Sequence, residues 1–199
     1  MYTPDGSETL YITELLIGNM DSQIRFLFLN LDGTRPVYRD RKIILFFDVR
    51  NAEKALRYSD CGAGILTCIP KEIENKVDFA LALGDLTAIT YGTESVIGNA
   101  GNFLDCLQLL MDIYFDTIHA SSIIQPLDTP TPKKLKVSVS PEEISNRFYR
   151  ILFCAANFFM FNVDMQQFVH ETGYAAEDVL SAFKYALGDL MTDAFFLCD

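Results

Sequence analysis

The chain has 199 residues, half of them hydrophobic, and a formal net charge of −11 at pH 7. This composition provides enough apolar material for a folded core and excludes an intrinsically disordered chain, which requires low hydrophobicity. The negative charge disfavours nonspecific nucleic-acid binding, because most of the surface would repel phosphate groups. A basic protein partner would be attracted to the same surface.

Three further observations bear on the class of protein. No apolar run approaches the roughly 20 residues that a membrane-spanning helix needs, so we expect no membrane partner. The start, MYTPDGSETL, lacks the basic and apolar regions of a secretory signal. The five cysteines are scattered and form no C-x-x-C pair, which disfavours a zinc site or a disulfide framework. Together these features predict a cytoplasmic protein without a cofactor.

The first part of the chain alternates strand-like runs with turns. Residues 9–17 and 24–29 are rich in β-branched, aromatic and other apolar residues and predict two strands. The Asp32-Gly33 pair marks a tight turn, and Val37-Tyr38 beyond it would complete a hairpin. Residues 39–41 predict a charged turn leading into the next strand.

Residues 41–58 are predicted to be the organising stretch of this part of the chain. The five consecutive apolar residues 43–47 indicate a central strand covered on both faces. Asp48 follows directly and, like Asn51, can cap a helix that buries apolar residues at 52, 55 and 56. Asp48 also stands where open sheets place catalytic residues, but helix capping is the simpler interpretation.

The stretch that follows predicts a strand, a helix and another strand. Residues 65–69 and 86–91 resemble strands by composition. Between them, Pro70 suits the first position of a helix, and apolar residues at 73, 77, 80 and 81 recur at helical spacing. We therefore expect a helix over 71–83, and a sheet-rich layer over residues 1–91.

The longest predicted helix runs over 102–119, within a sub-region of residues 92–124. Its polar residues recur every three or four positions and share one stripe, while the remaining positions are mostly apolar. We expect a mostly buried helix with one acidic edge. The polar residues of the stripe are Asp105, Gln108, Asp112, Asp116 and His119.

Three residues of that stripe, Asp112, Asp116 and His119, have a spacing at which a divalent metal could be shared. Metal sites between helices draw ligands from several facing helices, and the sequence offers no partner helix that is known to face this stripe. A solvated acidic edge explains the same residues. We therefore predict no metal site, with these three residues as its only candidates.

The remainder of the chain is predicted to be a linker followed by a helical unit. Residues 125–140 are rich in proline and lysine and resemble a linker. Ser140-Pro141-Glu142-Glu143 has the pattern of a helix start with a capping box. Further helices are expected over 164–171, ended by Gly173, and over 176–196. Residues 141–199 thus form an all-helical unit that packs on the sheet-rich layer.

Residues 165–187 have a weak helix-turn-helix pattern, with Val169, Gly173 and Val179 at the motif's offsets. The second helix would read DNA, yet it begins with acidic residues and carries only Lys184. Helical packing explains the pattern better, so nucleic-acid binding is disfavoured. A transcriptional regulator remains one alternative function.

The sequence as a whole predicts one α+β domain over residues 1–199, with a mixed N-terminal sheet, flanking helices and a helical C-terminal half. No catalytic signature is present. We therefore expect a non-enzymatic protein-interaction or ligand-binding module, acting on a basic protein as antitoxin or immunity proteins do. An enzyme whose site is assembled from distant residues is the other alternative. The aromatic C-terminal third also suggests a homo-oligomer, through Phe158, Phe159, Phe161, Phe195 and Phe196.

Overall fold

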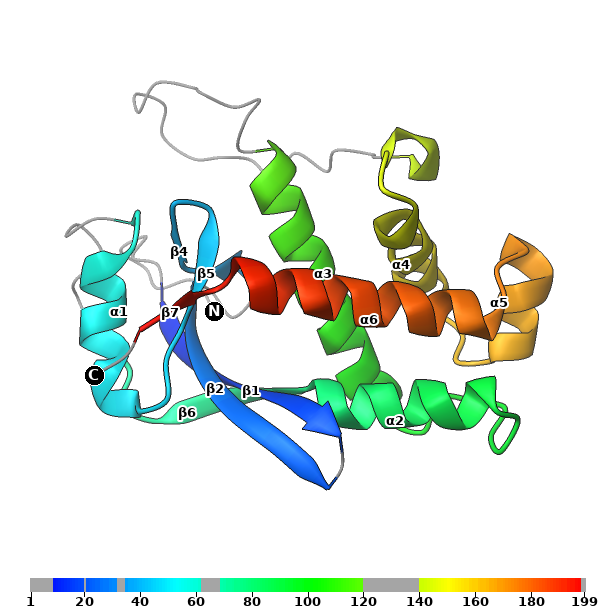
Figure 1. Cartoon of the computed structure of the whole chain (residues 1–199), viewed down its shortest axis with the longest axis horizontal. Helices are drawn as coiled ribbons and strands as arrows, with labels where there is room; N and C mark the ends of the chain where they lie inside the picture. Colours follow the sequence, from blue (N-terminus) through cyan, green and yellow to red (C-terminus); the bar gives the residue numbers. More distant parts are fainter. Residues whose placement is uncertain (1–8, 20, 32–34, 62–68, 120–139, 198–199) are drawn as a thin grey trace.

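The computed structural model describes residues 9–19, 21–31, 35–61, 69–119 and 140–197 (Figure 1). The strands are β1 (Leu10–Asn19), β2 (Ser22–Leu31), β3 (Arg35–Pro36), β4 (Tyr38–Arg39), β5 (Lys42–Leu45), β6 (Ile73–Asp78) and β7 (Phe195–Phe196). The α-helices are α1 (Ala52–Tyr58), α2 (Phe79–Thr90), α3 (Ala100–His119), α4 (Arg147–Phe159), α5 (Met165–Thr172) and α6 (Ala176–Asp193). Short 3-10 helices cover Val49–Asn51 and Pro141–Glu143.

The strands form two small sheets that touch at one bridge. In the first sheet the order is β3-β2-β1-β6, with β1 antiparallel to β2 and parallel to β6. The second sheet has the order β4-β5-β7. Leu27 of β2 and Phe46, just after β5, exchange two backbone hydrogen bonds of 2.7 and 2.9 Å, which join the sheets. This mixed sheet with its helices confirms the predicted α+β fold.

The strand alternation divides the apolar residues between two cores. On β1, Leu15 packs into the core shared with α2, α3, α4 and α6, whereas Ile12 packs into a smaller core against α1. On β5, Ile43 and Ile44 separate in the same way. The prediction of a strand covered on both faces is therefore confirmed. Its last residue is an exception, because Phe47 is 53% exposed.

Asp48 caps the 3-10 turn that leads into α1, whereas Asn51, at the N-cap of α1 itself, makes no side-chain capping bond. The Asp48 carboxylate accepts a 2.8 Å hydrogen bond from the backbone N–H of Arg50 and forms an ion pair with the Arg50 guanidinium. These contacts lower the pKa of Asp48 to about 2. Beyond the 3-10 turn, α1 buries its three inward residues, Ala52, Ala55 and Leu56, as expected.

The charged turn at 39–41 is a two-residue hairpin connection. Asp40 and Arg41 have φ values of 49° and 67°, the left-handed conformation that a type I′ turn requires at both central positions. The turn joins the antiparallel strands β4 and β5. It thereby fixes Tyr38, whose side chain reaches the helical half of the molecule.

Two predicted elements after residue 70 are wrong. The first part of the expected helix over 71–83 is strand β6, which pairs in parallel with β1, and only residues 79–83 are helical, as the start of α2. The expected strand at 86–91 lies in helix α2, which Asp78 begins by accepting a 3.0 Å hydrogen bond from the Leu81 N–H. The β-branched residues of that stretch adopt helix because Leu86 and Ile89 are buried in the larger core.

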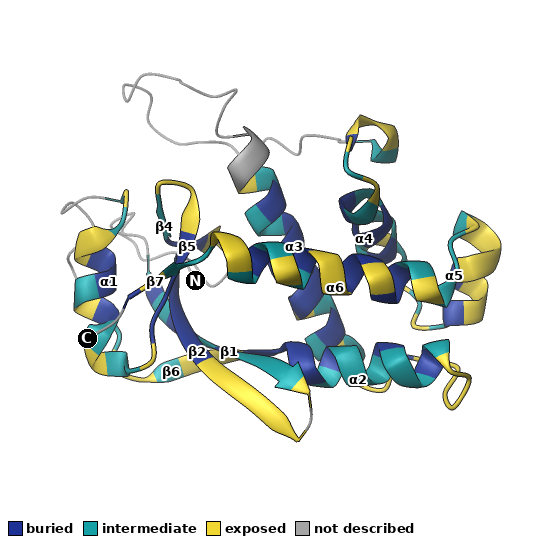
Figure 2. Ribbon diagram, viewed as in Figure 1, coloured by how far each residue is buried: buried dark blue, intermediate teal, exposed yellow. Residues whose placement is uncertain are grey.

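The helical half packs around the long helix α3. The ring of Phe103 on α3 lies 5.5 Å from that of Phe159 on α4 and 6.0 Å from that of Phe183 on α6. Figure 2 shows the buried faces of α3, α4 and α6 turned toward one another. The predicted long helix is confirmed and begins two residues earlier, at Ala100.

The ends of two predicted helices differ from expectation. The Ser140 N–H donates to the Glu143 carboxylate at 2.7 Å as a capping box requires, but only a 3-10 turn follows. Helix α4 begins later, at Arg147, where the Asn146 side chain accepts from the Phe148 N–H. The last helix stops at Asp193, and the two phenylalanines after Ala194 form β7. The C-terminal half therefore ends on a strand that joins the N-terminal part.

Some expectations lie outside the described residues. These are the Asp32-Gly33 turn, residues 65–68 of the expected strand and the 125–139 part of the linker. Helix α5 matches its prediction, since Asp164 caps its start and Gly173 ends it at φ 75°. Among the described helices, none combines the length and the apolar character needed to cross a membrane.

Candidate functional site

The acidic edge of α3 runs along the side of the helix next to the strands. Gln108 Nε2 donates a 2.7 Å hydrogen bond to Asp112 Oδ1. Burial raises the pKa of Asp112 to about 6, and the nearby Asp116 adds a smaller increase. Burial also raises the pKa of Asp105. The edge thus carries carboxylates that are partly withdrawn from water, which sequence spacing alone could not indicate.

A hydrogen bond links this edge to the second sheet. The Tyr38 hydroxyl donates to Asp116 Oδ2 at 3.0 Å, across 78 positions of the sequence. Burial raises the pKa of Asp116, while the Tyr38 hydrogen bond and the charge of Arg35 act in the opposite direction. The pKa of Tyr38 is raised far above its ordinary value, mainly by burial and then by the Asp116 charge. Sequence reasoning missed Tyr38 because nothing local marks a partner so distant.

The three candidate metal ligands have separate surroundings. Asp112 is engaged by Gln108 and Asp116 by Tyr38. The side chain of His119 lies outside the described residues. Within the described ranges, no three histidine, cysteine, aspartate or glutamate side chains are placed to share a metal ion.

A second candidate site lies at the end of the molecule where α2 ends and α5 begins. Its exposed apolar residues, which we call the tip surface, are Tyr91, Val96, Met160, Phe161, Val163 and Val169. Val96 forms a bridge with Asp164, and the Ile97 N–H donates to the Val163 carbonyl at 3.3 Å. These contacts bring the loop after α2 against the segment between α4 and α5.

The tip surface contains the two most exposed large apolar side chains among the described residues. Phe161 is 87% exposed and Tyr91 is 76% exposed. A shallow hollow of about 560 Å3 lies between the loop after α2 and helix α5, and Val169 of the tip surface lines it. Monomeric proteins rarely leave a contiguous apolar patch exposed without a binding role.

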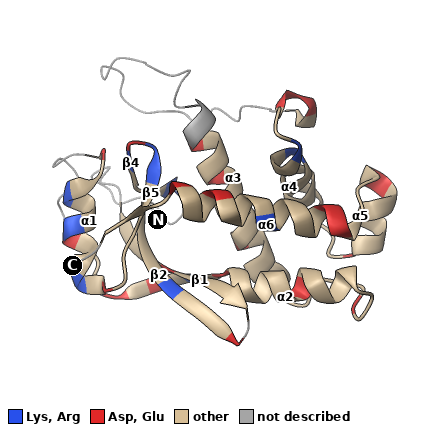
Figure 3. Ribbon diagram, in the orientation of Figure 1, with Lys and Arg blue, Asp and Glu red and all other residues tan. Residues whose placement is uncertain are grey.

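The surroundings of the tip surface are acidic. Glu94, Asp164, Glu171 and Glu177 lie in the segments that form it, and residues 151–183 contain no lysine or arginine. Figure 3 shows acidic residues on α5 and at the start of α6, and the basic residue of α6 farther along the helix. The segments of the tip surface from 151 to 183 thus supply no cation of their own, although Arg147 of α4 pairs with Asp178 beside Glu177.

The predicted helix-turn-helix segment does form two helices joined by a short turn. Val179 is fully buried, as the pattern expects, while Val169 is 37% exposed. In the first turn of α6, Asp178 is paired with Arg147 of α4 at 3.1 Å. A DNA-reading role for α6 stays a prediction, and its acidic first turn opposes contact with phosphates.

Two of the three described cysteines, Cys106 and Cys154, do not resemble nucleophiles. Cys106 on α3 is fully buried, and burial raises its pKa well above the ordinary value. Burial also raises the pKa of Cys154 on α4. A reactive cysteine requires the opposite shift. The thiols at 106 and 154 therefore pack as apolar side chains.

The phenylalanines expected to support self-association mostly pack inside the molecule. Phe159 is buried, Phe158 and Phe195 are half-buried, and Phe196 is 38% exposed. Phe161 alone of these five is fully available to a partner.

No family model, curated protein or solved structure was found to match this chain.

Proposed function

We propose that the protein is a non-enzymatic binding protein whose partner is a basic protein, in the manner of an antitoxin or immunity protein. The observation that supports this proposal most directly is the tip surface: an exposed apolar cluster around Phe161 with acidic residues and no lysine or arginine in its own segments. Apolar anchors surrounded by charge of one sign suit a partner that presents an apolar pocket within a basic rim.

The acidic residues around the tip surface also favour a basic partner over a second copy of the chain. In a symmetric dimer formed through the tip surface, the same patch would meet itself. Glu94, Glu171 and Glu177 of one copy would then approach their counterparts, and like charges across an interface oppose association. A basic partner relieves this repulsion.

The enzyme alternative has less support from the described residues. Asp105 and Asp112 lie two helical turns apart on α3, so they do not converge on one atom of a substrate in the way that an acid–base pair does. The cysteines at 106 and 154 are buried or half-buried with raised pKa values. Binding requires none of these catalytic features.

The test begins with affinity capture from cells that make the protein, using the tagged chain. The captured protein is identified, purified and titrated against the wild-type chain by calorimetry at about 0.05 M and about 0.5 M salt. We expect a basic partner whose affinity falls about tenfold or more at high salt. An acidic or neutral partner, or an affinity that does not depend on salt, would contradict the proposal.

A matched pair of variants locates the surface. Phe161→Asp introduces a charge at the centre of the tip surface and should weaken binding of the purified partner about a hundredfold, as expected for a hot-spot residue. Ile24→Asp introduces the same charge at another exposed apolar side chain, 55% exposed on β2, and should leave binding unchanged. Equal binding by both variants would show that the partner docks elsewhere.

A further inference from the structure

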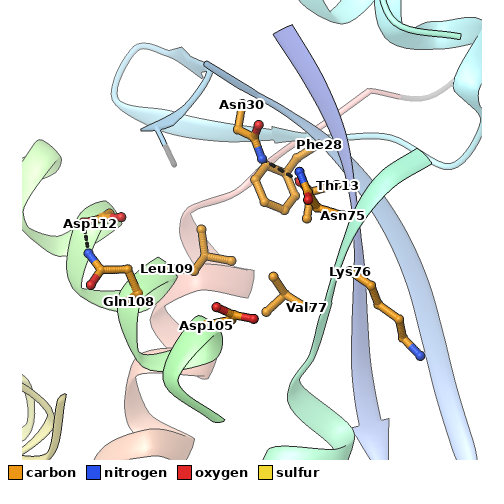
Figure 4. Close-up of a pocket in the computed structure, with 10 residues that line it drawn as sticks. All are labelled: Thr13, Phe28, Asn30, Asn75, Lys76, Val77, Asp105, Gln108, Leu109 and Asp112. Carbon is orange, nitrogen blue, oxygen red and sulfur yellow. Dashed lines mark hydrogen bonds between the residues drawn. The ribbon is translucent and has the colours of Figure 1, made fainter. Parts of the chain in front are cut away.

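A polar cavity of about 200 Å3 lies between α3 and the strands that face it (Figure 4). Its polar lining comes from α3 on one side and from β1, β2 and β6 on the other, and Figure 4 shows Gln108 turned toward Asp112 on the helix and Asn30 turned toward Thr13 on the strands. The polar residues are Thr13, Asn30, Asn75, Lys76, Asp105, Gln108 and Asp112. The cavity is smaller than the roughly 300–1,000 Å3 of most drug-sized ligand sites.

The strand side of this cavity carries an incomplete hydrogen-bond network. Among the described residues, Thr13 and Asn30 are two of the three buried polar residues, with 2% and 4% exposure. Asn30 Nδ2 donates to Thr13 Oγ1 at 2.5 Å, but Asn30 Oδ1 has no partner. Turning the amide over would leave its NH2 group unpaired instead. One end of a buried amide therefore lacks a partner in either orientation.

An unpaired buried amide end is destabilising, and a hydrogen-bonding group held in the adjoining cavity would satisfy it. The third buried polar residue is a useful contrast. Asp78 accepts from the Leu81 N–H at 3.0 Å and forms an ion pair with Lys76 at 3.2 Å. Its carboxylate oxygens are thus paired within the protein, whereas the amide of Asn30 is not.

The helix side of the cavity carries negative charge. Asp105 and Asp112 are seven residues apart on α3, which places them on one face about 10.5 Å apart along the axis. Burial raises the pKa of both carboxyl groups, so their charges are poorly compensated by water. Lys76 also lines the cavity, but its ammonium group is paired with Asp78 and extends away from the other side chains (Figure 4). The negative charges of Asp105 and Asp112 are therefore available to a cationic ligand.

We propose that this cavity binds a linear polyamine, with its two terminal ammonium groups at Asp105 and Asp112 and an internal amine donating to Asn30. The separation of the carboxylates requires an elongated ligand rather than a single ammonium ion. Phe28, Val77 and Leu109 supply the apolar lining that the methylene groups of such a chain need. A divalent metal suits the site less well, because no described group of three metal-ligating side chains exists there.

This site is separate from the tip surface, so it can be tested without the protein partner. Calorimetric titration of the purified full chain with spermidine, at about 0.05 M salt, should give saturable binding at one site. Butylamine, which has one ammonium group, should bind about tenfold more weakly or worse, because it forms only one of the two charge-assisted contacts. Binding of magnesium with equal affinity, or no heat with spermidine, would overturn the proposal.

Variants then assign the contacts. Asp105→Asn and Asp112→Asn should each weaken spermidine binding about tenfold, and Glu177→Gln, which removes an exposed carboxylate of α6, should have no effect. Two-dimensional NMR of the wild-type chain provides a readout that does not depend on the folding of any variant. Spermidine should shift the backbone amide signals of residues 13, 30, 75 and 105–112. Shifts confined to other acidic surfaces would assign the binding to general charge attraction and refute this site.

Discussion

The backbone N–H of Leu197 donates a 2.8 Å hydrogen bond to the carbonyl oxygen of Leu45, so the last described strand lies beside β5. The Leu197 side chain is 5% exposed and packs into the smaller core, against the side of the sheet that α1 covers. The end of the chain thereby connects the helical half to the N-terminal sheet. The two halves are thus in direct contact through the pairing of β7 with β5.

Leu197→Ala should therefore destabilise the whole molecule rather than fray its end. Removing a buried leucine side chain costs about 2–5 kcal/mol, and a site near the end of the chain should lie at the lower limit. Urea denaturation followed by circular dichroism should show a single transition with a lower midpoint. Phe161→Ala is the control, because its 87% exposed side chain should change the free energy of unfolding by less than about 0.5 kcal/mol. Equal midpoints for Leu197→Ala and the wild type would contradict the structural role of β7.

Local sequence signals correctly predicted several of the elements. The run 43–47 and the cap at Asp48 follow from apolar density and side-chain chemistry, and the structure contains both. The long helix followed from polar residues every three or four positions. In each of these cases the local pattern and the tertiary packing favour the same structure.

The errors arise where one pattern fits two structures. Ile73 and Val77 recur at a helical spacing, yet they lie in a strand whose pairing with β1 shifts register between them, so they pack into different cores. Pairing with β1 decides for strand, and no local signal reveals that pairing. Residues 86–91 include three β-branched residues and a tyrosine, which favour strand by propensity, yet the Asp78 cap and the burial of Leu86 determine a helix.

Of the site between α3 and the strands, only the α3 residues could be predicted from the sequence. The spacing of Asp105, Asp112 and Asp116 indicated an acidic edge, because all three lie on one helix. The facing residues Asn30 and Tyr38 belong to strands far away in the sequence, and only tertiary packing brings them to that edge. One sequence signal did point to Asn30. It is a polar residue two positions after Phe28 on the same strand, where an inward-facing apolar residue would be expected.

The contact between Tyr38 and Asp116 gives a second prediction. Tyr38→Phe removes the hydroxyl that donates to the Asp116 carboxylate at 3.0 Å, so the charged form of Asp116 loses support and its pKa should rise further. The free energy of unfolding at pH 7 should fall by about 1 kcal/mol, the lower range for a hydrogen bond to a charged group near solvent. Carboxyl-carbon NMR titration measures the pKa, and urea denaturation measures the stability.

A double-mutant cycle with Asp116→Asn tests whether the effect comes from this pair. The two substitutions should be less than additive, because either one removes the same hydrogen bond. Additive effects, together with an unchanged Asp116 pKa in Tyr38→Phe, would show that the pair does not interact in solution.

Alanine substitutions at two glycines should change the stability of the protein in opposite directions. Gly18 has φ 130°, and a Cβ atom there would clash with the backbone carbonyl of Ser22, across the β1–β2 hairpin. Gly18→Ala should therefore destabilise by about 2 kcal/mol or more, through strain at a position that side chains rarely adopt. Gly188 lies in α6 with open space around its Cα, so Gly188→Ala should stabilise by up to about 1 kcal/mol.

Both alanine variants can be compared in one thermal-denaturation experiment. Opposite shifts of the melting temperature are expected, which distinguishes local backbone geometry from a general effect of replacing glycine. A stable Gly18→Ala variant would mean that the hairpin at residues 18–22 is not as described.

The last prediction concerns Asp112 and pH. Its pKa is about 6 in the folded protein and 3.8 ordinarily, with burial as the main cause. Between these values the folded state binds a proton that the unfolded state has released, so stability decreases as pH rises through this range. The unfavourable contribution is absent below about pH 4 and complete above about pH 6. It is opposed by the Gln108 hydrogen bond and increased by the charge of Asp116.

Asp112→Asn removes this unfavourable contribution while keeping a side chain that can pair with Gln108. The variant should be more stable than the wild type by about 1 kcal/mol at pH 8, after allowance for solvent screening at a partly exposed site. At pH 4 the two proteins should have equal free energies of unfolding. Urea denaturation at pH 4, 6 and 8 measures the difference, and Glu177→Gln serves as the exposed control. A stabilisation that is independent of pH would show that packing or hydrogen bonding, rather than the buried charge, distinguishes the two proteins.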